Sequence, residues 1–315
     1  MKTDHLIVIR PGLNTTFQDF GRNHLYHIGL PFSGVMDKRN YLILNKLCGN
    51  DKASPVLEFA YQGPLLKFKG KKRNMVITGD VKFEIRKADE SIIKGTCYRT
   101  FEIENNDMID IISTNNSVFG YFSINGGFSL DKIWGSYSTT VRAAIGPNQG
   151  KKLIKDQIIN LNKNSYVSSK KINFLNSKIE FIRVIRGTNY DYFSNQSKLD
   201  FFSKEFVISK LSDRMGMRLE GVILDNKKST NIKSEGLVKG TIQVPSDGNP
   251  IIMLCDHGTI GGYPKFGVVI TADFDKLVQL PTGNKIKFKL INLNEAENIY
   301  KIYNMETNNI LSKIV

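Results

Sequence analysis

Apolar residues recur at alternate positions in short runs along most of the chain, and turn-forming residues separate these runs. Alternation with a period of two is typical of β-strands that are buried on one face. The strands expected in the first part of the chain cover residues 5–10, 56–61, 64–69, 74–78, 82–86, 98–103, 108–112, 118–124 and 154–161. Those expected later cover 180–186, 217–221 and 251–254. The pattern predicts an all-β protein with a few short helices.

A helical period is clearest from Met36 to Cys48, where Tyr41 and Leu44 recur at helical spacing. Gly49 follows as a natural terminator. Asp37 falls in the first turn, where the helix dipole favours a carboxylate, so a structural role for it competes with a role in a site. Shorter helical segments are expected within residues 190–202 and 294–304.

A change in composition at residues 162–178 predicts a domain boundary, because this stretch is rich in Asn, Ser and Lys and has little apolar pattern. We therefore expect an N-terminal β-rich domain at 1–178, a second β domain at 179–292, and a tail or short helix at 293–315. With 315 residues, the chain is long enough for two hydrophobic cores.

Composition narrows the protein class. Hydrophobic residues make up 41% of the chain, yet no apolar run approaches the ~20 residues of a membrane span, and the N-terminus lacks the features of a signal peptide. We expect a cytoplasmic protein that has no membrane partner. The scattered Cys48, Cys97 and Cys255 fit reduced thiols, and neither the cysteines nor the four histidines have metal-site spacing.

The net charge of +14 raises the question of nucleic-acid binding. The densest basic cluster, at residues 67–73, partly alternates with apolar residues along a predicted strand, which is more typical of a solvated edge. No recognition helix or set of base-stacking aromatics accompanies it. We therefore expect no nucleic-acid partner.

The stretch from Gln243 to Lys265 is the strongest candidate for a functional centre, because a short apolar core lies between two corners rich in Gly and Pro. Residues 245–248 predict a turn in which Gly248 takes a positive φ. Polar groups then lead into Gly261-Gly262-Tyr263-Pro264-Lys265. The alternative is a hairpin corner with Tyr263 packed inward.

Three other polar segments are candidates for chemistry. Residues 133–142 form a hydroxyl-rich loop that ends at Arg142, which either clamps an anion or is a buried arginine bonded to backbone carbonyls. Residues 15–22 bring an amide, a carboxylate and a guanidinium together. Residues 209–221 carry opposite charges around Gly216, as in a self-paired turn or a polar site.

The segment from Gly146 to Lys152 resembles a phosphate-binding loop only superficially. Its spacing is one residue short, and the hydroxyl that should follow the lysine is missing. A Gly-rich turn before the next strand is the better interpretation.

Five ordered motifs carry a family resemblance: RPGLNTTFQDFGR, GLPFSGVMDKRN, GSYSTTVRA, LSDRMGMRLEG and QVPSDGNPIIMLCDHGTIGGYPKFG. From about residue 6 to 292, the chain resembles the family of the 5-oxoprolinase C subunit. That family also includes allophanate hydrolase subunit 2, the Kip-type kinase-inhibitor antagonist, and subdomains A and B of the urea amidolyase carboxyltransferase domain. The run at 256–260 departs from the Arg-Gln-Thr-Thr type of run in many members.

The resemblance implies a cyclophilin-like β-barrel in addition to the N-terminal β-rich domain. It also implies a sister cyclophilin-like subunit that completes the active site, and a third subunit of LamB/YcsF type. The implied reaction is the ATP-dependent opening of 5-oxo-L-proline to L-glutamate, with ATP shared with a partner subunit. Such a reaction needs preorganised donors around an amide oxygen.

The residues expected in this site fall into two groups. The expected catalytic residues are Arg142, Arg214, Asp256 and Lys265. The expected substrate-binding residues are Ser136, Thr139, Ser212, Asp213, Gln243, Thr259, Gly261, Gly262 and Tyr263.

Two alternatives stay open within the family. The first is a biotin-dependent carboxyltransferase subunit of the urea carboxylase type. It requires biotin on a separate protein, because this chain has no Met-Lys-Met segment. The second is a non-catalytic antagonist of a kinase inhibitor.

Overall fold

The computed structural model describes residues 4–164, 168–174 and 179–314. Contacts divide the chain into two compact units. Unit 1 consists of Met1–Arg22, Ser33–Leu175 and Thr307–Val315, and unit 2 of Asn23–Phe32 and Asn176–Glu306. The expected boundary at residue 178 stays a prediction, because residues 175–178 lie outside the described residues. Asn23–Phe32 lies early in the sequence yet groups with unit 2.

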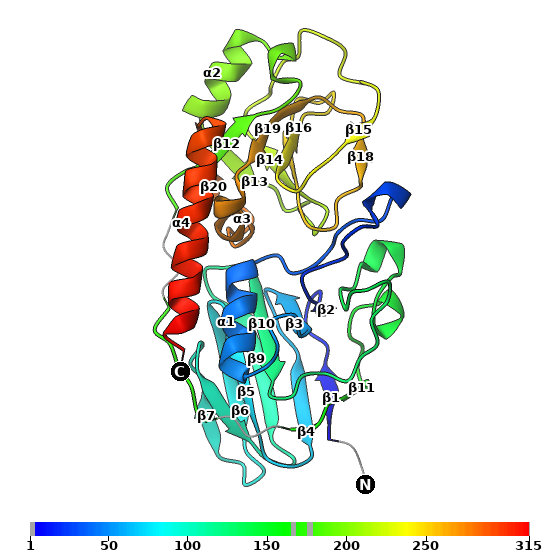
Figure 1. Ribbon diagram of the computed structural model, residues 1–315, viewed down its shortest axis with the longest axis vertical. Helices are drawn as coiled ribbons and strands as arrows, with labels where there is room; N and C mark the ends of the chain where they lie inside the picture. The colour runs from blue at the N-terminus through cyan, green and yellow to red at the C-terminus, as the bar shows by residue number, and fades with distance from the viewer. Residues whose placement is uncertain (1–3, 165–167, 175–178, 315) are drawn as a thin grey trace. The chain divides into compact units, whose positions relative to one another are not determined.

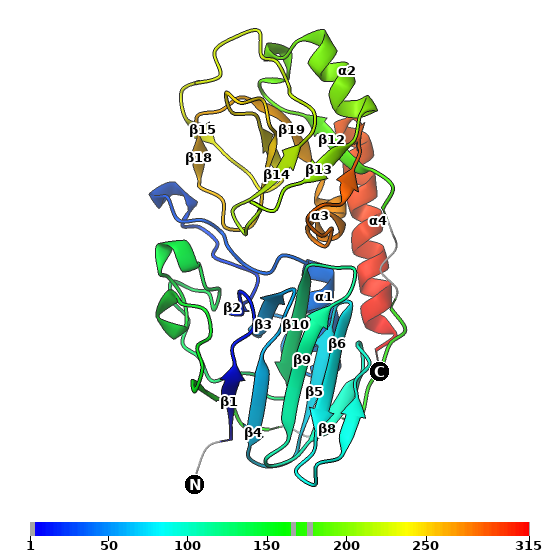
Figure 2. The ribbon, with the colours of Figure 1, turned by 180° about the vertical axis from the view of Figure 1, so that it is seen from behind.

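Unit 1 contains two antiparallel sheets (Figure 1). The strand order is β11-β1-β4-β9-β6-β7 in the six-stranded sheet and β2-β3-β10-β5-β8 in the five-stranded sheet. The strands are β1 (His5–Arg10), β2 (Thr16–Gln18), β3 (Val56–Ala60), β4 (Leu65–Lys69), β5 (Arg73–Thr78), β6 (Val81–Arg86), β7 (Ile92–Lys94), β8 (Thr100–Ile103), β9 (Met108–Thr114), β10 (Phe119–Ile124) and β11 (Ile158–Asn160). Figure 2 shows β4, β9 and β6 side by side. The predicted strands are found, although β11 covers only part of the predicted 154–161 because residues 155–156 form a turn. The three-residue strands β2 and β7 are additions.

The core of unit 1 is formed by apolar residues that recur at alternate positions along its strands. Leu6 and Val8 of β1 are buried and are part of a hydrophobic cluster formed by both sheets. Every residue of β10 is buried, because helix α1 (Lys38–Cys48) packs on the five-stranded sheet (Figure 1). Asp37 is the N-cap of α1, with its side chain accepting from the backbone N–H of Asn40 at 2.9 Å, and Gly49 takes the left-handed conformation at the C-cap. The structural role of Asp37 is thus confirmed.

Unit 2 is built on an eight-stranded sheet of order β20-β13-β14-β17-β16-β19-β12-β21, which curls into a nearly closed barrel. All pairs are antiparallel except β12 with β21. Its strands are β12 (Ile182–Arg186), β13 (Phe206–Ile208), β14 (Gly216–Glu220), β16 (Thr241–Gln243), β17 (Ile251–Met253), β19 (Lys265–Val269), β20 (Lys285–Ile286) and β21 (Phe288–Leu290). A separate two-stranded ribbon pairs β15 (Glu235–Gly236) with β18 (Ile260–Gly261). The predicted fold class, an all-β chain with a barrel, is confirmed.

Three α-helices accompany this barrel: α2 (Asn195–Ser203), α3 (Thr271–Val278) and α4 (Leu293–Ser312). The helix predicted within 190–202 is confirmed as α2. Helix α4 is longer than the predicted 294–304, and its Tyr303 hydroxyl donates to Asp275 of α3. The sequence missed α3, because its N-cap, Ile270, makes no side-chain capping bond and so lacks the usual start signal.

Four short 3-10 helices complete the secondary structure. They are η1 (Tyr26–Ile28), η2 (Val141–Ala143), η3 (Asn148–Gly150) and η4 (Tyr190–Tyr192). Inside unit 2, the ring of Phe201 on α2 lies 4.3 Å from Phe266 and 4.5 Å from Phe288, measured between centroids. This aromatic contact packs α2 against the barrel.

Candidate functional site

In unit 1 the hydroxyl-rich loop is organised by Asp19, which directly follows β2. Its Oδ1 accepts from the hydroxyls of Ser136 and Ser138, both at 2.6 Å, and from the N–H of Gly21 at 2.8 Å. Its Oδ2 accepts from the N–H of Tyr137 at 2.8 Å. Three of these bonds are at Oδ1 and one is at Oδ2, so groups of the chain itself use most of the acceptor positions of Asp19.

Arg22 and the threonines extend this network. The Arg22 guanidinium is 1% exposed and donates to the carbonyl of Ser138 and, at 3.3 Å, to the hydroxyl of Thr140. The backbone N–H of Thr139 donates to the carbonyl of Phe17 at 2.9 Å. The buried Thr139 hydroxyl has no hydrogen-bond partner among the described residues. Ser136 and Thr139 are thus both fully buried, which favours a supporting role for these two predicted substrate-binding residues.

Arg142 lies in η2, where the side chain is exposed. The alternative of a buried loop arginine is therefore wrong. Ala144, just after η2, has φ of 52°, a left-handed conformation that turns the loop back. An exposed guanidinium on a loop anchored by Asp19 is well placed to meet an anion, and this role stays a prediction.

In unit 2, Arg214 and Asp256 form a two-pronged ion pair. The guanidinium Nε and Nη2 donate to the two carboxylate oxygens at 2.8 and 3.0 Å. The side chains are 14% and 8% exposed, so both charges are largely desolvated. This charged partner of Arg214 lies 42 residues away in the sequence, outside the turn at 209–221.

Ser212 and Asp213 shape the turn before β14. Oδ1 of Asp213 accepts from the N–H groups of Met215 and Gly216 at 2.8 and 3.2 Å. The hydroxyl of Ser212 accepts from the N–H of Arg218 at 3.0 Å. These contacts account for both side chains as turn formers, and their predicted contact with a substrate stays untested.

The bend at Gly261 and Gly262 is a place of close approach. A Cβ at Gly261 would lie 2.5 Å from Nε2 of Gln243, and one at Gly262 would lie 3.2 Å from the carbonyl oxygen of Ile232. Neither glycine is among those with positive φ, so packing and not left-handed geometry excludes a side chain. The predicted turn at 245–248 is confirmed, with Gly248 at φ 74°.

Gln243 and Tyr263 lie on opposite sides of this bend. The Gln243 side-chain amide is buried and donates to the carbonyl of Tyr263 at 3.2 Å. The Tyr263 ring is 40% exposed, so the alternative with Tyr263 packed inward is wrong. Thr259 is buried, and its carbonyl accepts from the N–H of Leu237 in the neighbouring ribbon strand at 2.9 Å.

Lys265 begins β19 at the end of the bend. Its side chain is 7% exposed, and its ammonium lies 2.8 Å from Oε2 of Glu235. The backbone N–H of Lys265 donates to Oδ1 of the buried Asn189 at 3.0 Å. The lysine is therefore a buried charge that is fixed in position.

His257, which directly follows Asp256, is buried and pairs with the partly exposed ring of Tyr26. Burial lowers the pKa of His257, which is 1% exposed and whose Nδ1 lies 2.6 Å from the carbonyl of Gly258. Its ring centroid is 6.2 Å from that of Tyr26, and the Tyr26 hydroxyl donates to the carbonyl of Leu237. Burial raises the pKa of Tyr26. Both groups are thus held in their neutral forms near pH 7.

Within unit 2, the structure joins the predicted residues in separate contacts: Arg214 with Asp256, and Gln243 with Tyr263, whereas Lys265 pairs with Glu235. Sequence reasoning missed Glu235 and Asn189 and assigned no role to Asp19. The only available signal for Asp19 was the polar segment at 15–22. No signal in the sequence pointed to Glu235, because it lies in an exposed run in which apolar residues have no regular period.

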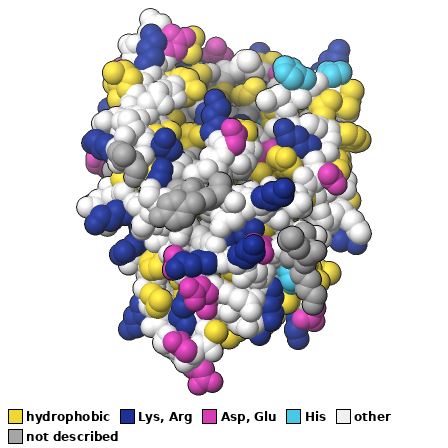
Figure 3. Space-filling model, turned by 60° about the horizontal axis from the view of Figure 1, so that its bottom comes forward, with side chains coloured by type: hydrophobic (Ala, Val, Ile, Leu, Met, Phe, Trp, Pro, Cys, Tyr) yellow, Lys and Arg dark blue, Asp and Glu magenta, His cyan; other side chains and the backbone are white. Residues whose placement is uncertain are grey.

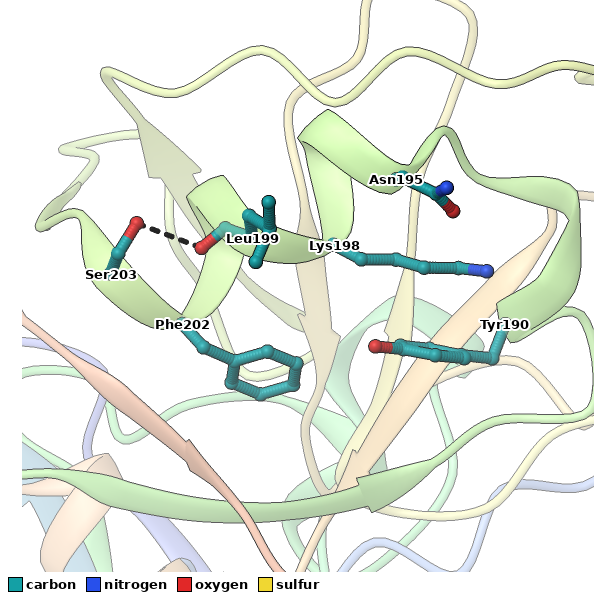
Figure 4. Close-up of a pocket in the computed structure, with 6 residues that line it drawn as sticks. All are labelled: Tyr190, Asn195, Lys198, Leu199, Phe202 and Ser203. Carbon is teal, nitrogen blue, oxygen red and sulfur yellow. Dashed lines mark hydrogen bonds between the residues drawn. The ribbon is translucent and has the colours of Figure 1, made fainter.

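A concave surface on α2 is separate from these residues (Figure 4). It has a volume of about 500 Å³ and is lined by Tyr190, Asn195, Lys198, Leu199, Phe202 and Ser203. Its polar groups already have internal partners: the Lys198 ammonium lies 4.7 Å from the Tyr190 ring centroid, and the Ser203 hydroxyl donates to the Leu199 carbonyl. We therefore do not assign the chemistry to this surface.

The surface charges, the helices and the possible metal ligands bear on partners and cofactors. On the face seen in Figure 3, basic side chains are spread among acidic and uncharged groups. Within the described ranges, no helix has the length and apolar character to cross a bilayer. The same residues contain no group of three or more His, Cys, Asp or Glu suited to a metal ion. Cys48, Cys97 and Cys255 are free thiols.

Comparison with known proteins places these features in context. The model of the family described as "Carboxyltransferase domain, subdomain A and B" matches residues 28–290. The chain is 32% identical over 283 residues to the 5-oxoprolinase C subunit of Haemophilus influenzae, covering 89% of each protein. It is 30% identical over 296 residues to the Escherichia coli protein of the same name, covering 92% of this chain and 93% of that one.

A solved structure extends the comparison. The urea amidolyase of K. lactis matches the whole chain with a TM-score of 0.88 and 25% sequence identity. The chain corresponds to 21% of that much longer protein.

Proposed function

Because the chain belongs to the family of the carboxyltransferase domain, subdomains A and B, we propose that it is a subunit of an ATP-dependent 5-oxoprolinase. The assembly would open 5-oxo-L-proline to L-glutamate with a sister cyclophilin-like subunit and a third subunit of LamB/YcsF type. One observation carries the proposal. The relatives named as the C subunit of 5-oxoprolinase match over 89% and 93% of their own lengths, so they share this chain's whole architecture.

The reaction makes a specific demand on the site. Opening the lactam breaks the ring C–N bond, places the oxygen of water on the acyl carbon, and delivers a proton to the nitrogen. Negative charge develops on the amide oxygen, which preorganised donors stabilise best in a water-poor site. The buried Lys265 ammonium is a preorganised cation that can hold an anionic oxygen of the substrate in such a site.

The other charged groups have supporting parts in this proposal. The Arg214–Asp256 pair anchors the turn before β14 to the segment that leads into the bend. Arg142, exposed on its loop in unit 1, would meet an anionic group of a substrate or a partner subunit. Its planar fork suits a carboxylate or a phosphate.

The segment at 146–152 does not fit ATP. A Cβ at Gly150 would lie 2.0 Å from the carbonyl carbon of Ala144, so this glycine is packed against its own loop and offers no open cradle. The side-chain amide of Asn148 donates to the carbonyls of Lys151 and Lys152 at 3.2 and 2.8 Å. We therefore assign no phosphate-binding role to this segment and expect partner subunits to supply the nucleotide site.

Carboxyl transfer is the second candidate function. It is favoured because part of the urea amidolyase structure matches the whole of this chain. It would use carboxybiotin carried by another protein, and the same ammonium would polarise the urea oxygen. The two candidates differ in their products, which makes them separable.

The test is to co-express the chain with its sister and third subunits and to supply two substrate sets in parallel. With ATP and 5-oxoproline we expect L-glutamate and ADP, and with carboxybiotin and urea we expect no carboxylated product. Glutamate must be absent when ATP is replaced by a non-hydrolysable analogue. Carboxylated urea without glutamate would reverse the order of the two candidates.

A further inference from the structure

Lys265 is a buried charge with unused hydrogen-bonding capacity. Its side chain is 7% exposed, and an ammonium has three N–H donors. Within the part of the chain that the structure describes, its Nζ makes one hydrogen bond, the 2.8 Å contact to Oε2 of Glu235. The remaining donors can serve a ligand oxygen.

The two members of this pair differ in burial. The Glu235 side chain is 47% exposed, whereas Lys265 is fixed at the start of a strand that pairs with β16 and β12. Glu235 lies on β15, a strand of two residues that pairs only with β18. If the pair separates, solvent can therefore hydrate the Glu235 carboxylate at a low cost in free energy, whereas it cannot hydrate the buried ammonium.

The surroundings of Glu235 leave room beside the pair. Glu235 is opposite Gly261 in the ribbon register, where Gln243 and Leu237 already occupy the Cβ position of the glycine. The Glu235 side chain itself is 47% exposed, so solvent borders the carboxylate. The carboxylate thus has space in which to move away from Lys265.

The Arg214–Asp256 pair has the opposite character. Both of its side chains are largely buried, at 14% and 8% exposure, and two hydrogen bonds join them. Releasing Asp256 would leave two desolvated charges uncompensated. Of these two pairs, the Lys265 pair is the one that combines a buried cation with a half-exposed anion.

We propose that Glu235 is a displaceable counter-ion of Lys265 and that an anionic oxygen of the substrate takes its place. The inference rests on the proposed function in one respect: 5-oxo-L-proline carries a carboxylate that suits this position. In the free protein Glu235 compensates the buried charge. On binding, the ligand carboxylate accepts from Lys265 while Glu235 turns to solvent, so the net charge around Lys265 is conserved. Glu235 is then a specificity-determining residue, because it sets the affinity that a competing anion must exceed.

The test uses Glu235→Gln, which keeps the shape and removes the charge. The matched control is Glu220→Gln, an exposed glutamate on β14 of the same unit. The full-length proteins are treated with N-hydroxysuccinimidyl acetate at fixed pH, and acetylation of Lys265 is followed by peptide mass spectrometry. Loss of the neighbouring carboxylate releases the ammonium from its ion pair, so Lys265 should react faster in Glu235→Gln and at the wild-type rate in Glu220→Gln.

Formate is then added as a carboxylate probe, and chloride at equal ionic strength is the control. We expect formate to protect Lys265 at about 3- to 5-fold lower concentration in Glu235→Gln than in wild type, the scale of a partly exposed ion pair. Equal protection in the two proteins, or none in either, would overturn the displacement.

A second arm uses 5-oxo-L-proline and its neutral carboxamide with the co-purified subunits, by calorimetry. The acid should bind more tightly after Glu235→Gln, and the carboxamide should bind equally to both. If formate protects Lys265 but 5-oxoproline binds neither protein, the counter-ion assignment stands and the 5-oxoprolinase proposal fails. Weaker binding of the acid to Glu235→Gln would instead place Glu235 in contact with the substrate and refute displacement.

Discussion

The Asp19 network in unit 1 and the Lys265 bend in unit 2 are both buried and charged, yet they differ in how far their hydrogen-bonding capacity is used. Asp19 accepts four hydrogen bonds from its own chain, which use most of the acceptor positions of its carboxylate. Lys265 makes one side-chain hydrogen bond to a carboxylate that is half exposed. A buried charge whose hydrogen-bonding capacity is mostly used holds loops in place, whereas one with unused capacity can still bind a ligand. Burial alone does not separate the two roles.

The largest effect should follow from Asp19→Asn. The amide would present an N–H group to donors that need an acceptor, so we expect the free energy of unfolding to fall by about 3–5 kcal/mol. Urea denaturation measures this change. Asp131→Asn is the control, because Asp131 is exposed on the segment that precedes Ser136. Its effect on the free energy of unfolding should stay within about 0.5 kcal/mol. A loss below about 1 kcal/mol for Asp19→Asn would show that the network is not structural.

The two ion pairs of unit 2 should respond unequally to loss of their cations. Arg214→Met leaves Asp256 buried and uncompensated, which should cost about 3 kcal/mol. Lys265→Met leaves only the half-exposed Glu235 unpaired and should cost less than about 1 kcal/mol. The same denaturation experiment compares them. Equal losses would remove the basis for calling Glu235 displaceable.

Arg142→Lys tests the exposed guanidinium that the Asp19 network supports. Lysine keeps the charge but loses the planar fork, so activity in the assembled complex should fall about tenfold, the equivalent of ~1.4 kcal/mol. Thermal melting should be unchanged, because the side chain is exposed. Full activity in a folded Arg142→Lys protein would reduce Arg142 to a surface charge.

The smallest effect concerns His257 and the pH dependence of stability. Burial holds its folded-state pKa below the ordinary 6.5, so between these two values the unfolded state binds more protons. The stabilisation is present above pH 6.5 and is lost as the pH falls through this window. Unfolding at pH 7.5 and 5.5 should show a larger loss for wild type than for His257→Gln. Equal losses would indicate that solvent reaches the imidazole.

Local patterns in the sequence predicted most strands of unit 1, because alternation fixes which face of a strand is buried, but only β12, β14 and β17 among the eight barrel strands of unit 2. The helix at α1 was predictable from Asp37 and Gly49, which cap it. Contacts between distant residues were not predictable in this way. Asp19 meets Ser136 across 117 residues, and Glu235 meets Lys265 across 30 residues from a strand of two residues. The sequence therefore identified Lys265 as a candidate but not the carboxylate that compensates it.

The central claim is that this chain contributes Lys265 to a shared 5-oxoprolinase site, and 5-oxoproline-dependent release of ADP tests it most directly. The purified assembly would be measured with the wild-type chain, without the chain, and with Lys265→Met. We expect ADP release only when the chain is present, and a decrease of about 10² for Lys265→Met, the scale of one lost preorganised donor. Release at the wild-type rate with Lys265→Met, or without this chain, would contradict the account.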